Sequence, residues 1–370
     1  MVLYILTYLV WVDIMHLNHM WNQLHTRRWI TLITIKDVAQ LAGVSKATVS
    51  RVLNNSGYVN EATRQKVEVV MKEHQYIPSA SAVSLSRQET STIGVLVPEI
   101  DNMFYGDVLH GITEVADQNE LSLIFFDTQD NGEKEARALR TLSQQRVRGL
   151  ILSPAVDYSN DAMASNLRKQ LNALNIPVVI VDRDSDNMPW DGVFYENYQS
   201  SYQAAIELYK AGNRRLGVIT GDLKLKIGRD RLEGFRQGVL DCGLKLREED
   251  VFEGDFLTPR AYELSKAMFR SGDWPQAIYT SNNSTSLGFL KAAHECGIEI
   301  GKDIAVIGND RIDILDMLGI PFSCVYRDNH EMGHVALRML LERIENPDRP
   351  RNICMIPYSV QLSGSEKIKK

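Results

Sequence analysis

The amino-acid sequence predicts an α/β protein in which a small all-α helix-turn-helix unit precedes two doubly wound parallel-sheet subdomains. The chain has 370 residues, 44% of them hydrophobic and 24% charged, which is enough for two or three domains with real cores. Residues 34–74 show helical periodicity, and from Thr92 onward short apolar runs alternate with amphipathic segments. The high apolar content and the net charge of −6 exclude a mainly disordered chain.

The first residues contain an apolar run, residues 2–12, that ends at Asp13. This run is too short for a membrane-spanning helix, which needs about 20 residues. No Lys or Arg precedes it and no small-residue cleavage site follows, so a secretory signal is not indicated either. We therefore expect residues 1–33 to be an N-terminal extension outside the functional protein, with the true start at Met15, Met20 or a non-standard codon near Leu32.

Residues 34–53 have the pattern of two short helices joined by a tight turn. Thr34 is a good N-cap for the first helix and Ser45 for the second. Gly43 follows the first helix, where a left-handed backbone costs least in glycine. The apolar residues that we expect to form the buried stripe of the first helix are Ile35, Val38 and Leu41.

The second helix, residues 46–53, is predicted to bury Val49, Val52 and Leu53. Its outer, N-terminal part then presents Lys46, Ala47, Ser50 and Arg51, as a recognition helix does toward base edges. A third amphipathic helix is expected from about 60 to 74, with Val67, Val70 and Met71 turned inward. Residues 34–88 carry seven basic and four acidic side chains, so this stretch has a net charge of +3 and the remainder −9. A small basic segment followed by a large acidic one is typical of a nucleic-acid-binding domain joined to another domain.

Residues 34–78 closely resemble the DNA-binding headpiece of the lac repressor family of bacterial transcription regulators. The resemblance implies base contacts by Lys46, Ala47 and Arg51, which agrees with the pairing of Arg with guanine and of Ala with the thymine methyl group. The other headpiece residues for which it implies contact with DNA, mainly the phosphate backbone, are Thr34, Ser45, Thr48, Ser50, Asn54 and Tyr76.

Residues 79–91 form a small-residue segment that is too weakly apolar to be a stable helix alone. In the family the corresponding segment becomes a hinge helix when paired with its partner on DNA. The resemblance then implies that Leu85 enters the minor groove and that Ala82 allows close helix approach. A flexible linker is the alternative interpretation of the same composition.

The large body, residues 92–364, contains apolar runs typical of strands buried on both faces of a parallel sheet. Two sets of such runs predict two subdomains with a cleft between them. This part also resembles the family's effector domain, which shares its fold with periplasmic sugar-binding proteins. We expect one lobe to comprise about 92–192 plus 328–346, and the other about 193–327 plus 347–364.

Ligands of open α/β sheets bind beyond the carboxyl ends of the strands. Strand ends and the resemblance together predict an effector site made of Phe104, Tyr105, Asp182, Arg229, Arg231, Phe256, Asn282 and Asp310. Carboxylates, amides, Arg and aromatic faces suit a sugar, and purines would use the same groups. Arg311 and Arg327 add charge near the cleft and suggest an acidic or phosphorylated sugar.

Residues 330–334 spell H-E-x-x-H, the helix signature of zinc peptidases. Leu337 and Leu340 stand where the extended motif requires Gly and a third His. We therefore interpret the stretch as a structural helix, closely packed through Gly333 and Ala336, and expect no metal site.

The sequence gives no indication of an enzyme or a cofactor, since it lacks a phosphate-binding P-loop, a G-x-S-x-G elbow and a dinucleotide fingerprint. The four cysteines are far apart, which favours reduced thiols in a cytoplasmic protein. We expect a homodimeric, sequence-specific repressor of transcription that binds double-stranded operator DNA and is controlled by a small sugar-like effector. A solute-binding protein of the same core fold is the alternative.

Overall fold

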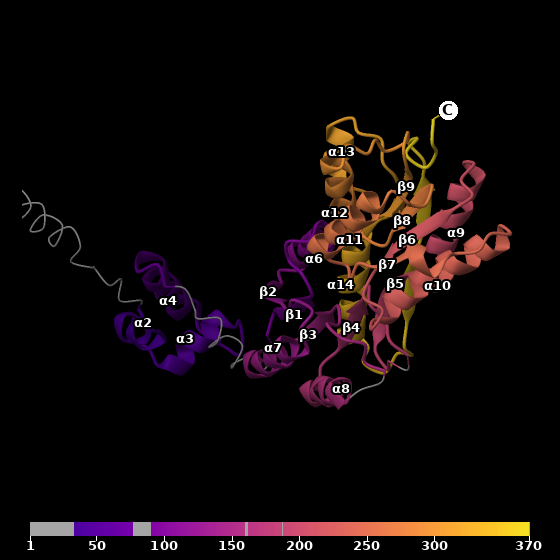
Figure 1. Cartoon of the computed structure of the whole chain (residues 1–370). Coiled ribbons are helices and arrows are strands. Elements are labelled where there is room, and N and C mark those ends of the chain that lie inside the picture. The colour runs from indigo at the N-terminus through magenta and orange to yellow at the C-terminus, as the bar shows by residue number, and fades with distance from the viewer. Residues whose placement is uncertain (1–32, 77–89, 160–161, 187, 370) are drawn as a thin grey trace, which may run out of the picture. The chain divides into compact units, whose positions relative to one another are not determined.

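The computed structural model describes residues 33–76, 90–159, 162–186 and 188–369 (Figure 1). The chain folds as two units, Met1–Glu89 and Thr90–Lys370, and each is described by itself. The expectations for the N-terminal extension and for hinge residues Ala82 and Leu85 lie outside the described residues.

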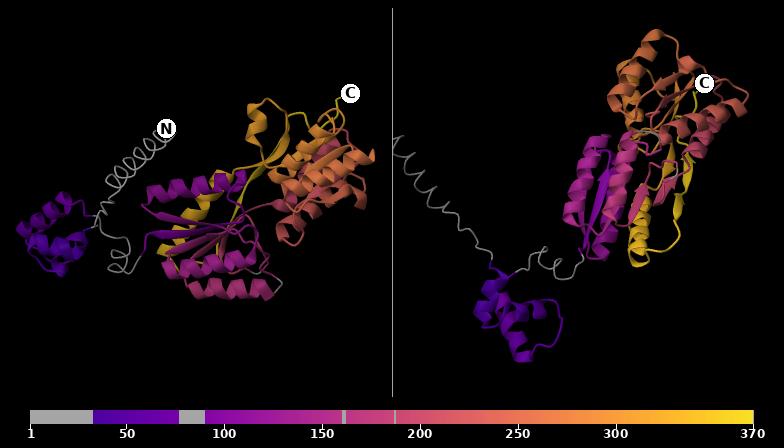
Figure 2. Two further views of the ribbon diagram at one scale, coloured as in Figure 1. Left: turned by 60° about the vertical axis from the view of Figure 1, so that its left-hand side comes forward. Right: turned by 90° about the horizontal axis from the view of Figure 1, so that it is seen from below.

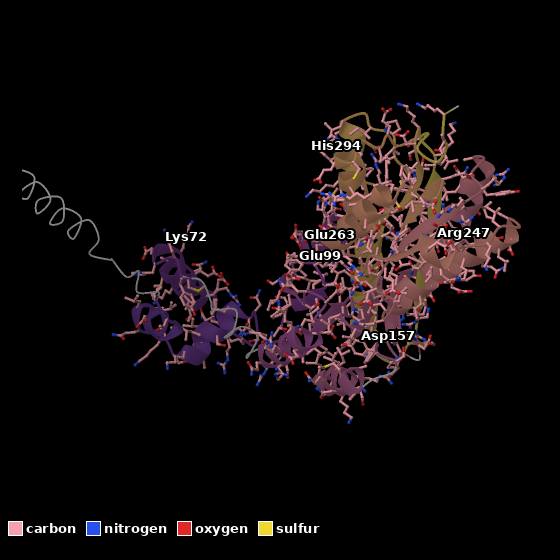
Figure 3. All side chains as sticks on the ribbon, viewed as in Figure 1. Lys72, Glu99, Asp157, Arg247, Glu263 and His294 are labelled. Carbon is pink, nitrogen blue, oxygen red and sulfur yellow. The ribbon has the colours of Figure 1, made fainter. Side chains whose placement is uncertain are left out.

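The described part of the N-terminal unit, residues 33–76, contains three helices, α2 (Ile35–Ala42), α3 (Lys46–Leu53) and α4 (Glu61–Glu73). Thr34 caps α2 in a capping box with Asp37, and the Ser45 side chain accepts a hydrogen bond from the Thr48 N–H at the start of α3. Gly43 ends α2 in the left-handed conformation, with φ 67°. The predicted caps are thus confirmed. Lys72 lies in the last turn of α4, where a positive charge complements the helix dipole (Figure 3).

The core of this unit consists of Val38, Ala39, Val49, Val52 and Val67, all buried. The predicted inner faces of α3 and α4 are confirmed, but Leu41 on α2 is 53% exposed, so its predicted burial is wrong. Three residues advance about 300° around a helix, so each step of three falls about 60° short of a full turn. The first step leads from Ile35 to Val38, and the second, from Val38 to Leu41, turns the Leu41 side chain away from the core. Ala39 and Ala42 occupy the inner face in its place.

The second unit begins with a six-stranded parallel sheet in the order β11-β5-β4-β3-β1-β2. Helices cover both of its faces (Figure 2). One face packs against α6 (Met103–Gln118) and α14 (Asn329–Glu345), and the other against α7 (Gly132–Gln145) and α8 (Ala162–Leu174). Its strands are β1 (Thr92–Val97), β2 (Ser122–Asp127), β3 (Gly149–Leu152), β4 (Val178–Val181), β5 (Asp191–Tyr195) and β11 (Ile353–Ile356).

A second six-stranded sheet has the order β12-β10-β9-β8-β6-β7, with β12 antiparallel to β10 and the other pairs parallel. One face packs against α9 (Asn197–Lys210) and α10 (Lys226–Asp241), the other against α11 (Thr258–Ser271), α12 (Asn283–Glu295) and the short α13 (Asp313–Met317). Its strands are β6 (Leu216–Thr220), β7 (Val251–Glu253), which the 3-10 turn η1 (Glu248–Asp250) precedes, β8 (Ala277–Thr280), β9 (Ala305–Asn309), β10 (Ser323–Arg327) and β12 (Tyr358–Gln361).

The structure corrects the expected grouping of the returning chain. The sequence predicts that all of residues 347–364 belong to the second lobe. In the structure, β11 pairs with β5 in the first sheet, and only β12 joins the second sheet. The expected first-lobe limit at residue 192 also falls inside β5. Only Pro357 separates β11 from β12, so the chain passes from one sheet to the other within one residue. Proline has no backbone N–H and therefore cannot donate a hydrogen bond to a neighbouring strand of either sheet. Among the described residues, no helix is long and apolar enough to span a membrane.

Helices α6 and α14 approach each other so closely that only glycine fits at their crossing. A Cβ added to Gly111 would lie 2.1 Å from the His330 carbonyl oxygen, and one added to Gly333 would lie 2.1 Å from that of Val108. The backbones of the two helices are therefore in direct contact, as the sequence predicted for Gly333 and the buried Ala336.

Replacing Gly333 with Ala is expected to lower the free energy of unfolding by about 1–3 kcal/mol, because the new methyl group forces the two backbones apart. Denaturant unfolding followed by circular dichroism measures this difference. Gly106→Ala on α6 is the matched control: its Cβ meets nothing within 4 Å, and helix propensity favours Ala by about 1 kcal/mol. Equal stabilities for the two variants would contradict the close crossing.

Candidate DNA-binding face and effector site

One face of α3 carries the residues for which base contacts are predicted. Lys46, Ala47 and Arg51 are exposed, while Val49 and Val52 on the opposite face are buried in the core of the unit. A helix held in this way can enter a major groove with its polar face without losing its packing. The structure thus brings the three predicted base-contacting residues onto one surface.

Polar side chains at both ends of α3 hold each other in place. The Ser45 and Thr48 hydroxyl oxygens lie 2.9 Å apart, and the Asn54 amide nitrogen donates to the Ser50 hydroxyl oxygen over 3.3 Å. Hydroxyl and amide groups at such positions can also donate to phosphate oxygens. Their contact with DNA remains a prediction.

Two other predicted DNA contacts, Thr34 and Tyr76, have structural roles in the unit. The Thr34 hydroxyl donates to an Asp37 carboxylate oxygen over 2.6 Å. This hydrogen bond is the main reason why the pKa of Asp37 is lowered. Tyr76 packs against the helical core, and burial raises the pKa of its phenol.

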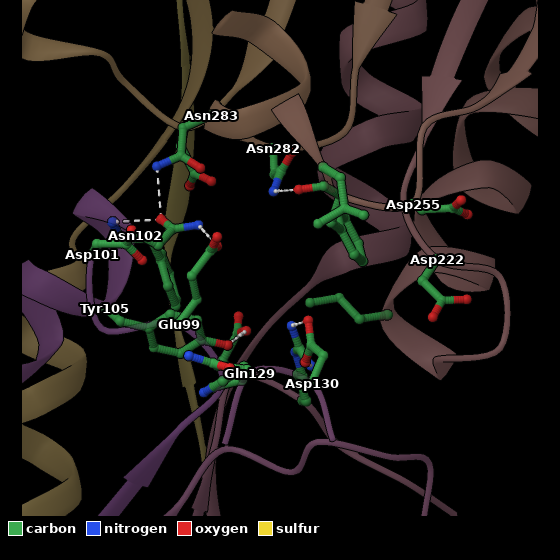
Figure 4. Close-up of a pocket in the computed structure, with 18 of the residues that line it drawn as sticks. Glu99, Asp101, Asn102, Tyr105, Gln129, Asp130, Asp222, Asp255, Asn282 and Asn283 are labelled. Carbon is green, nitrogen blue, oxygen red and sulfur yellow. Dashed lines mark hydrogen bonds and ion pairs between the residues drawn. The ribbon is translucent and has the colours of Figure 1, made fainter. Parts of the chain in front are cut away.

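A cavity of about 760 Å³ lies between the two sheets of the second unit (Figure 4). This volume is typical of small-molecule sites. Seven of the eight residues predicted for the effector site line it, namely Phe104, Tyr105, Asp182, Arg231, Phe256, Asn282 and Asp310.

Two aspartates reach the cavity from equivalent places in the two sheets. Asp182 directly follows β4 and Asp310 directly follows β9, in backbone conformations with φ 63° and 80°. Each N–H still donates to the neighbouring strand, to the carbonyl oxygens of Val193 and Val325 respectively, over 3.0 Å. A left-handed conformation costs a non-glycine residue about 1–3 kcal/mol and occurs preferentially at functional sites. Here it holds both carboxylates at the strand ends.

Arg327, the last residue of β10, connects these two carboxylates. Its Nε donates to Asp310 Oδ1 over 2.9 Å, and its Nη1 lies 3.9 Å from Asp182 Oδ1. The guanidinium carbon lies 5.1 Å from the ring centre of Phe104 and 4.3 Å from that of Tyr195, within the range of cation–π contacts.

One donor and one acceptor in this group lack a hydrogen bond. Asp182 Oδ1 and Arg327 Nη1 are buried and form an ion pair with each other at 3.9 Å, but within the described part of the chain neither makes a hydrogen bond. Buried polar atoms in folded proteins are almost always hydrogen-bonded, and the exceptions mark strain, a catalytic role, or a bound water or ion. A group that both donates and accepts, such as a hydroxyl, can satisfy both atoms at once.

Arg231 is a second buried guanidinium, only 2% exposed, on α10. It donates to the Asn197 side-chain oxygen over 2.9 Å and to the Ser281 carbonyl oxygen over 2.5 Å, but forms no ion pair with a carboxylate of the described residues. Burial and then the charge of Arg327 lower its pKa. The ring of Phe256, which fits over Gly221, lies 5.6 Å from its guanidinium carbon.

Tyr105 supplies a neutral hydroxyl at the floor of the cavity. Its hydroxyl lies 3.0 Å from the Ser153 hydroxyl oxygen and donates to Asp182 Oδ2 over 3.1 Å. Burial raises the pKa of the phenol far above its usual value, so the group stays protonated. It therefore fixes the orientation of Asp182 and leaves Oδ1 free for another donor.

Amide side chains join the two lobes across the mouth of the cavity (Figure 4). The Asn283 amide nitrogen donates to the Asn102 side-chain oxygen over 2.9 Å. Asn282 caps α12 and donates from its amide to the Phe256 carbonyl oxygen over 3.3 Å. Movement of one lobe against the other has to break or remake the contact between Asn102 and Asn283.

Arg229 is the predicted effector residue that the structure places elsewhere. It is not among the described residues that line the cavity, and it pairs with Asp157 of the first lobe over 2.7 Å (Figure 3). Lys226 makes a similar inter-lobe ion pair, 3.1 Å from Asp184. Arg229 therefore connects the lobes and is not a ligand contact in this structure.

Sequence reasoning missed an ion pair between a buried arginine and an exposed aspartate that line the cavity. Arg183, which directly follows Asp182, pairs with Asp130 and also donates to the Pro154 carbonyl oxygen over 3.2 Å. Asp182 was predicted because it follows the carboxyl end of a strand, and the same argument applies to Arg183. Position in the sequence does not reveal that Arg183 contacts Asp130, a loop residue more than 50 positions earlier. Other lining residues that the sequence does not predict include Gln129, Asp222, Lys224, Ile227 and Asp255.

The charges around the cavity disfavour the acidic sugar suggested by Arg311 and Arg327. Arg311 pairs with Asp313 and Asp316 and is not among the described lining residues, while Arg327 is already paired with Asp310. Among the described residues that line the cavity, four are basic and eight carry carboxylates: Glu99, Asp101, Asp127, Asp130, Asp182, Asp222, Asp255 and Asp310.

Comparisons with known proteins agree with both parts of the site. Residues 34–79 match the family described as "Bacterial regulatory proteins, lacI family", and residues 90–360 match "Periplasmic binding proteins and sugar binding domain of LacI family". The chain is 31% identical over 322 residues to the HTH-type transcriptional repressor PurR of Photobacterium profundum, covering 87% of this chain and 95% of that one. It is 30% identical over 342 residues to the ribose operon repressor of Haemophilus influenzae, covering 91% and 100%.

A solved structure of the lac repressor dimer, bound to operator and the anti-inducer ONPF, has a TM-score of 0.77 to this chain. The two are 26% identical, and the match covers 90% of this chain and 99% of the other. The resemblance thus extends over the helical unit, both sheets and the cavity between them. This chain belongs to the LacI family of bacterial transcription regulators.

Proposed function

We propose that this chain acts as a homodimeric repressor whose α3 binds operator DNA and whose inter-lobe cavity binds a neutral, hydroxyl-rich small molecule that controls DNA binding. Each dimer would present two copies of α3 to the two halves of a near-palindromic operator. Contacts to phosphates would supply much of the affinity and make it strongly dependent on salt.

The observation that supports this ligand class best is that Asp182 Oδ1 and Arg327 Nη1, buried and 3.9 Å apart, have no hydrogen bond among the described residues. A sugar hydroxyl donates to the carboxylate oxygen and accepts from the guanidinium, so it completes both groups. The aromatic side chains of Phe104 and Phe256 provide apolar surface for the ring of such a ligand. The excess of carboxylates in the lining favours a neutral ligand over an anion.

The relatives point to the same arrangement. One is named a ribose operon repressor, and the lac repressor structure holds operator DNA together with a small-molecule anti-inducer. A solute-binding protein would use the same core, but residues 34–79 and the exposed basic residues Lys46 and Arg51 would then have no role. We therefore favour the regulator.

Selection of genomic fragments by the purified protein, followed by gel shifts at increasing salt, tests the proposal. A discrete complex with particular fragments, weakened by salt, is expected. Neutral sugars such as ribose and cellobiose, and purine bases as the competing ligand class, are then added to the complex. A protein that shows no preference among fragments with or without these molecules would contradict the proposal.

Replacing Arg51 with Ala is expected to weaken binding to the selected operator about 10- to 100-fold, because an Arg–base contact contributes about 1–3 kcal/mol of discrimination. Lys66→Ala on α4 is the matched control, since this exposed residue has the same charge and is not in the predicted contact set. Fluorescence anisotropy of labelled operator measures both. Equal losses would mean that Arg51 contributes only its charge.

A further inference from the structure

A cluster of three histidines and one glutamate lies outside the cavity, where α6 crosses α14. α6 contributes His110 and Glu114, four residues apart, and α14 contributes His330 and His334, also four residues apart. Residues at this spacing share one face of a helix. The two pairs therefore face each other across the crossing.

The glycine contacts explain why the two pairs meet. Gly111 follows His110, and Gly333 precedes His334, and at both positions the opposing backbone leaves no room for a Cβ. The side chains next to these glycines are consequently held by two helices in backbone contact. A ligand site on rigid elements of this kind is better defined than one on loops.

The four side chains converge on the Glu114 carboxylate. Its Oε1 lies 3.5 Å from His110 Nε2 and 3.3 Å from His330 Nε2, and its Oε2 lies 2.9 Å from His334 Nε2. The possible ligand atoms of His110, Glu114 and His330 all lie within 4.8 Å of one another. Two imidazole nitrogens and a carboxylate oxygen gathered this closely can bind one cation together.

We propose that His110, Glu114 and His330 form a binding site for a borderline transition-metal ion, best suited to Zn²⁺, that fastens α6 to α14. Imidazole and carboxylate groups are ligands that zinc accepts. His334 Nε2, 2.9 Å from Glu114 Oε2, holds the carboxylate in place.

This site differs from that of a zinc peptidase, because only His330 of the H-E-x-x-H stretch is among its ligands. Two of its ligands come from α6, more than 200 residues earlier in the chain. Glu331, the general base of a peptidase motif, lies 3.4 Å from His334 Nδ1, where it orients the imidazole. The proposal thus adds a metal ion to the closely packed helix that the sequence predicts.

Calorimetric titration of the full chain with ZnCl₂, after chelator treatment and without an affinity tag, tests this site. The wild-type protein is expected to bind one more equivalent of zinc than His330→Ala/His334→Ala. The difference between the two isolates the site, because any binding by His16, His19 and His25 is common to both. Zinc is also expected to raise the melting temperature of the wild-type protein and not of the double variant.

His110→Gln provides a second variant that keeps the fold, since the His110 side chain is 69% exposed. Loss of an orienting neighbour typically weakens metal affinity 10- to 100-fold, so loss of a direct ligand should weaken it at least about tenfold. His294→Ala, an exposed histidine on α12, is the control and should bind zinc as the wild type does (Figure 3). The same zinc stoichiometry in the wild type and the double variant, or no binding by the wild type at 100-fold excess over about micromolar protein, would overturn the proposal.

Discussion

Replacing Arg327 with Met is expected to lower the free energy of unfolding by about 3–5 kcal/mol, because it leaves the buried carboxylate of Asp310 without its cation. The Met side chain keeps most of the volume of the arginine stem, so the effect reports the charge and not a cavity. Thermal and denaturant unfolding of the purified variant measure the change.

Arg311→Met is the matched control for this experiment. Arg311 is in the same lobe, but its partners Asp313 and Asp316 are exposed, and surface ion pairs contribute about 0–1 kcal/mol. Adding Asp310→Asn to the Arg327 variant should recover part of the lost stability, since no unpaired charge then remains. Equal stabilities of the Arg327 and Arg311 variants would mean that the pair with Asp310 is not formed in solution.

Replacing Arg231 with Met is expected to weaken effector binding about 10- to 150-fold, since a hydrogen bond from a charged group contributes about 1.5–3 kcal/mol. Arg231 is buried without a carboxylate partner among the described residues, and it lines the cavity. Calorimetry measures the affinity for whichever neutral sugar raises the melting temperature of the wild-type protein.

Arg229→Met provides the control on the same helix. Its side chain pairs with Asp157 and is not among the described lining residues, so direct contacts with the ligand should be unaffected. The expected change in affinity is within about 1 kcal/mol, the usual limit for exposed ion pairs. A larger loss for Arg229 than for Arg231 would reverse the assignment of the two arginines.

The positions of the helix caps and the ends of the strands could be predicted from the sequence, because their causes are local. Thr34, Gly43 and Ser45 act through neighbouring backbone atoms, and Asp182 and Asp310 follow apolar runs that form buried strands. Strand ends together with the family resemblance then found seven of the eight predicted cavity residues.

The errors concern helical phase and contacts between distant segments. Arg229 and Arg231 are two positions apart, about 200° around a helix, so only one of them could face the cavity. The predicted burial of Leu41 was wrong for the same reason, because its position around the helix was misjudged. The pairing of His330 and His334 with His110 and Glu114 depends on where two helices cross, which helical periodicity does not reveal.

The most direct test measures the operator affinity of the wild-type protein and of Arg231→Met, each with and without the stabilising sugar. The account predicts that the sugar changes the operator dissociation constant of the wild-type protein at least about fivefold, the lower range of measured allosteric couplings. The same sugar concentration should leave the Arg231 variant unchanged. A sugar that binds the wild-type protein in the cavity, yet leaves its operator affinity the same, would contradict the claim that this cavity controls DNA binding.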